Sequence, residues 1–245
     1  KKRHTFGKMK MEVQNMDGTK ITDLSPTKSK GINVIYWNFN KNIPKMAEGK
    51  TLSFGGFASP RVSAGNYKII MTKGKKTYEH IIEVNYDEDS LTTLAERKEQ
   101  EELTATLFNM VEDLAYMVYE LNQNMDKAQE VIDEHPKGKK KAQQAHDALN
   151  NLLKTLVITT GDNYVASADP ELREKMGDLY SGVAENYGKV TGARLENFEV
   201  VSEEFVLAKQ KYQSIMDKEV KKLYSFLEKN EIKLPEIKSK EEFLK

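Results

Sequence analysis

The 245-residue chain contains no cysteine. A disulfide framework, a thiolate zinc site and a cysteine nucleophile are therefore excluded. Long apolar runs are missing as well. None reaches the roughly 18 residues of a membrane-spanning helix, so we expect no membrane insertion. The chain opens Lys1-Lys2-Arg3-His4 with neither an initiator methionine nor a signal peptide, and we expect it to be a piece of a longer protein.

The chain also lacks an excess of charge of either sign. It has 38 Lys and Arg residues and 38 Asp and Glu residues, so its formal net charge is zero. Because a nucleic-acid-binding domain usually carries a basic excess, we expect no nucleic-acid partner. We interpret the local basic run from Lys137 to Lys141 as a solvated helix start rather than a phosphate-binding patch.

The residue patterns of familiar active sites are missing too. Histidines never occur three or four residues apart, so they form no helical metal-binding pair: His4, His80, His135 and His146. Some acidic residues could suit a di-iron bundle but lack the Glu-x-x-His pairs that it needs: Glu99, Glu101, Glu102, Glu112 and Asp113. Nucleophile-elbow, Walker and dinucleotide motifs are absent. We assign no catalytic residue, metal ligand or cofactor, and predict that the chain is not an enzyme.

What the chain does have is a long heptad pattern between Leu91 and Glu134. Its apolar residues alternate in steps of four and three: Leu103, Leu107, Met110, Leu114, Met117 and Leu121. This spacing predicts a helix that lies along other helices, roughly 60 Å long. Thr93-Leu94-Ala95-Glu96 predicts a capping box at its start, and Pro136 predicts its end. Asn124 lies on the apolar seam, where one polar residue can set the register of neighbouring helices.

Three further helices are predicted after this one. They run from Lys139 to about Ile158, from Asp169-Pro170-Glu171 to Tyr187 and from Ala193 to Asn230, with a loop from Thr159 to Ala168. Near Met216 the apolar stripe of the last helix shifts, which predicts a change in its packing. The order long, short, short, long favours an up-down-up-down four-helix bundle.

Before Tyr86 the apolar residues follow a period of two instead. Strands are predicted at 9–14, 19–24, 32–39, 51–57, 67–72 and 77–84, with hairpin turns at Asp17-Gly18 and Lys73-Gly74-Lys75. Short antiparallel strands at this spacing favour an immunoglobulin-like sandwich. The predicted fold is therefore α+β, with a sandwich at residues 1–88, a four-helix bundle at 89–234 and a loosely held C-terminal tail at 235–245.

One group of side chains is a candidate ligand or partner surface on the predicted sandwich: Phe54, Phe57, Arg61 and Tyr67. Aromatic faces pack on the apolar faces of sugars, so the three aromatic residues could form a sugar-binding platform. Their alternation along the chain equally places them in the core of the sandwich. Both interpretations stay open.

Three strand segments carry a resemblance to a known family: Gly31–Asn38, Ser63–Ile69 and Thr77–Val84. With the helical segment Leu172–Tyr180, they resemble the C-terminal region of large secreted bacterial proteins that contain sortilin-like (VPS10-like) β-propellers, often labelled BNR-repeat glycosyl hydrolases. The resemblance implies an extracellular, cell-surface or periplasmic location. It also implies that partners are the upstream propeller domains of the same parent chain or envelope proteins, and it transfers no catalytic residue.

The function that we predict is that of a non-enzymatic accessory module, which positions a propeller domain or a partner in a larger secreted or cell-surface protein. The alternative is a carbohydrate-binding module that assists a glycoside-processing propeller. A third possibility is an enzyme subunit whose site lies between the two domains. A pocket with converging polar groups at that junction would favour the third possibility, and a flat, dry junction would argue against it.

Overall fold

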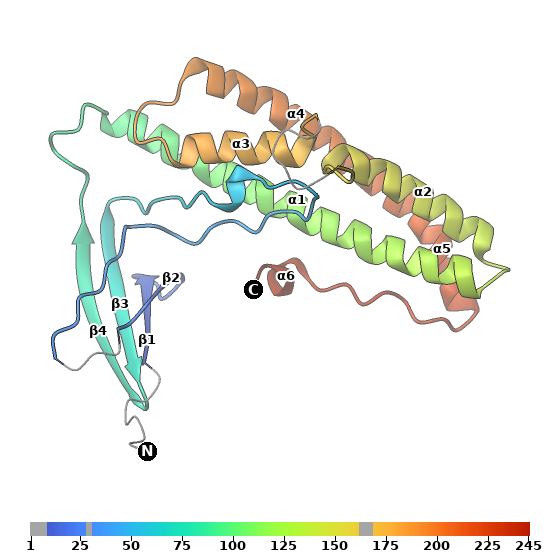
Figure 1. Ribbon diagram of the computed structural model, residues 1–245, viewed down its shortest axis with the longest axis horizontal. Coiled ribbons are helices and arrows are strands. Elements are labelled where there is room, and N and C mark those ends of the chain that lie inside the picture. The colour runs from blue at the N-terminus through green and yellow to red at the C-terminus, as the bar shows by residue number, and fades with distance from the viewer. Residues whose placement is uncertain (1–8, 28–30, 162–168) are drawn as a thin grey trace.

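The computed structural model describes residues 9–27, 31–161 and 169–245. The fold is α+β: a small antiparallel sheet projects from one end of an elongated unit of helices (Figure 1). His4 lies outside the described residues, as does most of the loop predicted between Thr159 and Ala168. Within the described part of the chain, no helix is both long and apolar enough to cross a membrane.

The sheet has four strands in the order β2-β1-β3-β4, all antiparallel. The strands are β1 (Met9–Asn15), β2 (Lys20–Leu24), β3 (Gly65–Lys73) and β4 (Lys76–Val84). Both predicted hairpin turns are confirmed, and each has a glycine with positive φ, Gly18 and Gly74. The core of the sheet is small: Val13, Val62 and Tyr67 are buried, and Trp37 packs against them.

Two of the predicted strands are wrong. Residues 32–39 form no strand, and among the described residues there is no second sheet that could complete a sandwich. Phe39 has a φ of 59° and turns the chain into an isolated bridge between Asn40 and Arg61. The other segment, 51–57, contains the short 3-10 helix η1 (Phe54–Gly56), which packs on a helix. The immunoglobulin-like sandwich is therefore not confirmed.

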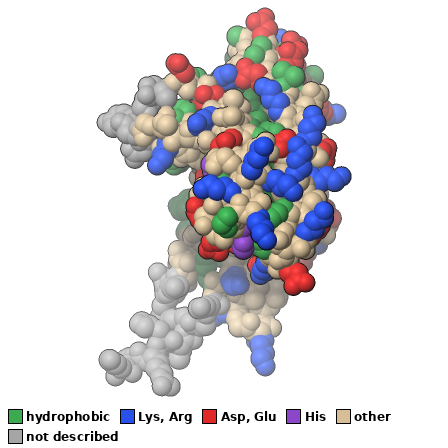
Figure 2. Space-filling model, turned by 90° about the vertical axis from the view of Figure 1, so that its right-hand side faces the viewer, with side chains coloured by type: hydrophobic (Ala, Val, Ile, Leu, Met, Phe, Trp, Pro, Cys, Tyr) green, Lys and Arg blue, Asp and Glu red, His purple; other side chains and the backbone are tan. Residues whose placement is uncertain are grey.

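The helical unit is built on α1 (Leu94–Glu134), 41 residues long as the heptad pattern predicted. The capping box is confirmed, since Thr93 Oγ1 accepts from the Glu96 N–H and the Glu96 carboxylate accepts from the Thr93 N–H. The other helices are α2 (Lys139–Leu156), α3 (Leu172–Ala184), α4 (Gly192–Ile215) and α5 (Lys221–Lys229). The basic run at the start of α2 is exposed, at the end of the molecule where Figure 2 shows many Lys and Arg side chains.

The helices do not run up-down-up-down. The end of α3 lies beside the start of α1, where Gln100 Nε2 donates to the Val183 carbonyl (2.7 Å), so α3 is antiparallel to α1. The start of α2 packs on the end of α1, so α2 is antiparallel to α1 as well. Together α2 and α3 form one interrupted return path, after which α4 and α5 run back parallel to α1 (Figure 1). The predicted four-helix bundle is not confirmed.

The predicted change of packing near Met216 is a π-helical segment, η2 (Met216–Val220), between α4 and α5. Hydrogen bonds join α1 to the helices on either side of it. Tyr212 Oη donates to a Glu120 carboxylate oxygen (2.7 Å), and Tyr224 Oη donates to Asn124 Oδ1 (2.5 Å). Asn124 is fully buried on the seam, where its contact with Tyr224 aligns α5 with α1.

The C-terminal residues are held more firmly than the sequence predicted. They end in a short helix, α6 (Lys240–Leu244), that packs across the middle of α1. The Phe243 ring stacks on Tyr119 with the ring centroids 4.8 Å apart, and Lys240 forms an ion pair with Asp113. Aromatic stacking and charge therefore fix a segment whose own apolar content is low.

Candidate functional site

A loop between the sheet and the helices organises the junction of the two. We call residues 41–60 the clasp loop. Its two ends meet, since the Lys41 N–H donates to the Pro60 carbonyl (2.7 Å) and the Val62 N–H donates to the Phe39 carbonyl (2.8 Å). Between these ends it leaves the sheet and packs on the helices, where Ala47 and Ala58 belong to the helical core. The sheet is thus attached to the helices by more than the connection from β4 to α1.

A buried arginine of α3 holds the clasp loop. Arg173 donates through Nε to the Ala47 carbonyl (2.6 Å) and through Nη1 to the Thr51 carbonyl (3.0 Å). The same Nη1 contacts the carboxylate of Glu174 at 2.6 Å, and Thr51 Oγ1 donates to that carboxylate as well. Both charged side chains are more than nine-tenths buried. If the loop moved away, the Arg173–Glu174 pair would lose its added hydrogen bonds, and if either residue were removed, the other would be left as an unpaired buried charge. Both changes are costly, so this pair fixes the path of the loop.

The loop also approaches α3 through glycines. A Cβ on Gly55 would lie 2.8 Å from the Gly177 Cα, and a Cβ on Gly177 would lie 2.1 Å from Ser53 Oγ. Gly55 and Gly177 therefore allow the close contact between η1 and α3. Tyr180, one turn further along α3, donates to the Ala58 carbonyl (3.2 Å).

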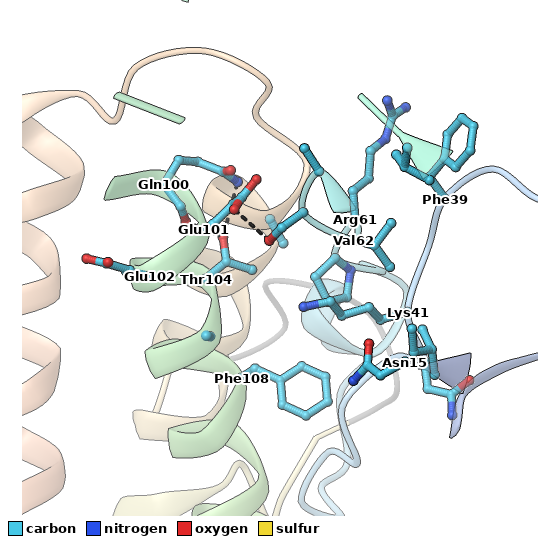
Figure 3. Close-up of a pocket in the computed structure, with 18 of the residues that line it drawn as sticks. Asn15, Phe39, Lys41, Arg61, Val62, Gln100, Glu101, Glu102, Thr104 and Phe108 are labelled. Carbon is cyan, nitrogen blue, oxygen red and sulfur yellow. Dashed lines mark hydrogen bonds between the residues drawn. The ribbon is translucent and has the colours of Figure 1, made fainter. Parts of the chain in front are cut away.

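A cleft of about 1500 Å³ lies between the sheet and α1. Its walls come from the end of the sheet, from both ends of the clasp loop and from one face of α1 (Figure 3). Leu244 and Lys245, at the end of the chain, line it as well. Aromatic side chains from the sheet, from α1 and from segments next to them line it: Phe39, Tyr67, Tyr86, Phe108 and Tyr187. The junction is therefore hollow and partly polar.

Glu101 of α1 links the two walls of the cleft. Its carboxylate accepts hydrogen bonds from Ser63 Oγ (2.7 Å) and from Tyr86 Oη (2.8 Å), both of which belong to segments next to the sheet. Burial raises the pKa of Tyr86, and the nearby Glu101 carboxylate raises it further. The same two causes, in the same order, raise the pKa of Tyr67. Both phenols therefore stay protonated, which keeps Tyr86 a donor to Glu101.

Arginine side chains fix the mouth of the cleft around Tyr187. The Arg61 guanidinium lies over the Tyr187 ring, 3.9 Å from its centroid, and Arg97 Nη2 donates to the Tyr187 carbonyl (2.6 Å). The first contact is a cation–π interaction between the residue that follows the clasp loop and the segment after α3. Both arginines are thus engaged within the chain.

Two ionisable side chains at the cleft have few partners within the chain and could bind a ligand. The Lys41 ammonium has no ion-pair partner among the described residues. The Glu112 carboxylate accepts one long hydrogen bond, from the Lys45 N–H at 3.4 Å, and burial raises its pKa. With the aromatic lining, these groups suit a polar ligand that has apolar faces. No histidine is found among the described residues that line this cleft.

The four residues of the candidate surface do not form one patch. Arg61 and Tyr67 line the cleft, where Tyr67 is only 8% exposed and donates to the Ser63 carbonyl. Phe54 and Phe57 lie on the clasp loop, are 55% and 67% exposed, and do not line the cleft. The predicted sugar platform of three aromatic residues is therefore divided between two places.

The residues that hold the junction were not predicted. Arg173 and Glu174 lie in a helix whose apolar stripe was recognised, and one signal was present. Arg173 is three and seven residues before Met176 and Tyr180, which places it on the buried face. Across the described ranges, no group of three or more His, Asp or Glu side chains is placed to hold a metal ion. Glu99, Glu101, Glu102, Glu112 and Asp113 form no such group.

Comparison of the chain with protein families, with curated proteins and with solved structures finds no match. The resemblance to the C-terminal region of sortilin-like propeller proteins therefore rests on the four segments named above.

Proposed function

We propose that this chain is a non-enzymatic interaction module of a larger secreted or cell-surface protein, and that it positions a propeller domain or an envelope protein partner. The observation that supports this best is the clasp loop, which joins a projecting sheet to a long helical unit through buried contacts of Arg173. A module that sets the position of a neighbour needs such a fixed angle between its parts. In this proposal the sheet belongs to an immunoglobulin-like module and the helices are its bundle-like support.

The absence of cysteine makes a direct test of the fixed angle possible, because introduced thiols are the only ones present. Spin labels on Lys75→Cys, at the tip of the sheet, and on Lys137→Cys, at the far end of α1, report the distance between the two parts. We expect a narrow distance distribution that broadens in Arg173→Met. Lys175→Met is the matched control, because Lys175 lies on the same helix as Arg173 and forms a partly exposed ion pair with Glu204 of α4. A broad distribution in the parent protein would contradict the proposal.

The non-enzymatic part of the proposal has its own test, which is needed because the hollow, partly polar junction is the feature that would favour an enzyme subunit instead. The chain is incubated with panels of glycans and peptides, and products are measured by mass spectrometry. We expect no turnover. Specific turnover that is lost in Glu112→Gln, the one carboxylate of the cleft whose pKa burial raises, would instead identify an enzyme whose site lies at the junction.

Carbohydrate binding is the second candidate function, and the aromatic and polar lining of the cleft favours it. Phe39 is 44% exposed at the cleft and Phe57 is 67% exposed on the clasp loop. Glycan-array binding that Phe39→Ala abolishes and Phe57→Ala leaves intact would assign the sugar to the cleft. The reverse result would assign it to the loop, and no glycan binding at all would reject this candidate.

A further inference from the structure

The outer edge of β4 is long, regular and exposed. All nine residues of the strand pair with β3, from Lys73↔Lys76 to Gly65↔Val84, without a bulge. The first six, from Lys76 to Ile81, are exposed to solvent. In the part of the chain that the structure describes, β4 pairs only with β3, and it lies on the outer side of the sheet in Figure 1. Such an edge is a template for another strand.

The opposite edge of the sheet is protected. The edge strand β2 has five residues, and its pairing with β1 is interrupted by a register shift between Val13 and Gln14. Its Lys20 and Asp23 side chains form an ion pair along it. Short length, a bulge and charge are the features by which proteins prevent pairing at an edge. Strand β4 has the length and regularity that β2 lacks.

The hairpin geometry determines which backbone groups of β4 point outward. The turn between β3 and β4 has two residues, Gly74 and Lys75, so Lys73 and Lys76 form the closing hydrogen-bonded pair. Hydrogen-bonded and non-hydrogen-bonded pairs then alternate along the ladder. The residues whose N–H and C=O groups face outward are therefore Thr77, Glu79, Ile81 and Glu83. These groups are available to a second strand.

We propose that two copies of this chain join edge to edge through β4, antiparallel, about a twofold axis at His80. The charge pattern selects this register. An axis at Glu79 would place Glu79 of one copy opposite Glu79 of the other. An axis at Ile81 would place Glu79 of one copy opposite Glu83 of the other. An axis at Tyr78 or Ile82 would pair little more than half of the strand. The axis at His80 pairs the whole strand and never places one acid opposite another.

The side chains match in this register as well. On one face, Tyr78 of each copy lies opposite Ile82 of the other, an aromatic and β-branched pair of the kind that stabilises antiparallel strands. On the other face, Glu79 lies opposite Ile81. Lys68 of β3 already partners Glu79, with 3.7 Å between Nζ and the carboxylate. The acid is thus neutralised within its own chain before a second copy arrives.

A pair of substitutions at Ile81 tests the proposal, because this side chain is 49% exposed and faces Glu79 of the other copy. The mass is measured by sedimentation equilibrium over a range of concentrations, and the parent chain should reach twice its 28.0 kDa. Ile81→Glu should raise the dissociation constant roughly tenfold, since it places two acids opposite each other on both sides of the axis. Ile81→Lys should lower it, since it faces Glu79.

The effects of these substitutions on the stability of the single chain can be told apart from their effects on dimerisation. Within one chain Ile81 pairs with Lys68 of β3, so Ile81→Glu gains a partner and Ile81→Lys meets a like charge. Stability against urea, measured at low concentration, should therefore change in the opposite direction to dimerisation. A mass of 28.0 kDa at every concentration, or equal effects of the two substitutions on association, would overturn the proposal.

The register has a separate test, because the chain has no cysteine of its own. His80→Cys places two thiols at the axis in a non-hydrogen-bonded pair, with the Cα atoms about 4.5 Å apart, within reach of a disulfide. Thr77→Cys is the control, because its thiols would be separated by about 20 Å along the strands. Mild oxidation should cross-link the first variant and not the second. Equal cross-linking of both would contradict the proposed register.

Discussion

The helices and the sheet of this protein differ in how they are stabilised. The helical unit has a continuous apolar core that extends along α1, including fully buried residues such as Leu107, Leu121 and Met176. The core of the sheet has three buried side chains, and Tyr78 and Ile81 remain about half exposed. Since burial of apolar surface is the main stabilising contribution, the sheet depends on its attachment to the helices. The clasp loop is therefore central to the stability of the sheet.

The largest expected effect is on that attachment. Arg173→Met leaves the Glu174 carboxylate buried without its partner and should cost about 4 kcal/mol of folding free energy. The only tryptophan, Trp37, packs on the sheet, so its fluorescence reports the sheet while far-UV circular dichroism reports the helices. Urea transitions of the two signals should coincide in the parent chain and separate in the variant. Lys175→Met, in a partly exposed pair with Glu204, should cost less than about 1 kcal/mol.

A substitution within the helical core should affect both signals together. Leu121→Ala removes a fully buried side chain of α1 and should cost about 3 kcal/mol, because the rigid surroundings leave a cavity. Both transitions should move to lower urea concentration and stay coincident, since the sheet does not persist without the helices. Val200→Ala, at an exposed position of α4, is the control. A tryptophan transition that stays in place would show that the sheet folds independently.

A substitution within the sheet should have a smaller and more local effect. Val13→Ala empties part of the small core and should cost about 2 kcal/mol. We expect the tryptophan transition to shift further than the circular-dichroism transition. An equal shift of both would mean that the sheet and the helices unfold as one cooperative unit as long as the clasp loop is intact.

The smallest expected effect depends on pH. Burial raises the pKa of Glu112, so the folded state holds its proton to a higher pH than the unfolded state does. The ionised Glu112 carboxylate therefore destabilises the folded state relative to the unfolded state. This destabilisation is absent well below the ordinary pKa of 4.5, grows as pH rises through the raised pKa, and is complete above it. Glu112→Gln should stabilise the protein at neutral pH and have no effect at low pH. Urea denaturation at pH 7 and pH 3 measures the difference.

Local patterns predicted the parts of this fold whose structure depends on near neighbours. The heptad of α1, its capping box at Thr93 and the two hairpin turns each have a signal within a few residues. Even the packing change near Met216 was visible as a shift of the apolar stripe, and it is a π-helical segment. The directions of the helices were not visible in the sequence. Helices α2 and α3 follow each other in the same direction along α1 instead of running in alternating directions.

The clasp loop and the cleft could not be predicted in this way. Residues 51–57 have an apolar pattern typical of a strand, but their hydrogen bonds to the helices join Thr51 to Arg173 and Glu174, more than a hundred positions away. The role of Glu101 depends on Ser63 and Tyr86, which only the folded chain brings together. Intrinsic strand preference is weak beside such contacts.

The meeting ends of the clasp loop have a mechanical consequence. The chain passes from the sheet to the helices after residue 41, is back at the sheet by residue 60, and passes to the helices again between β4 and α1. A single connection would act as a swivel, whereas crossings at separate points resist both bending and torsion. Tension applied at the sheet would therefore be shared between the loop and α1, and the projecting strands would act as a lever on the long helix.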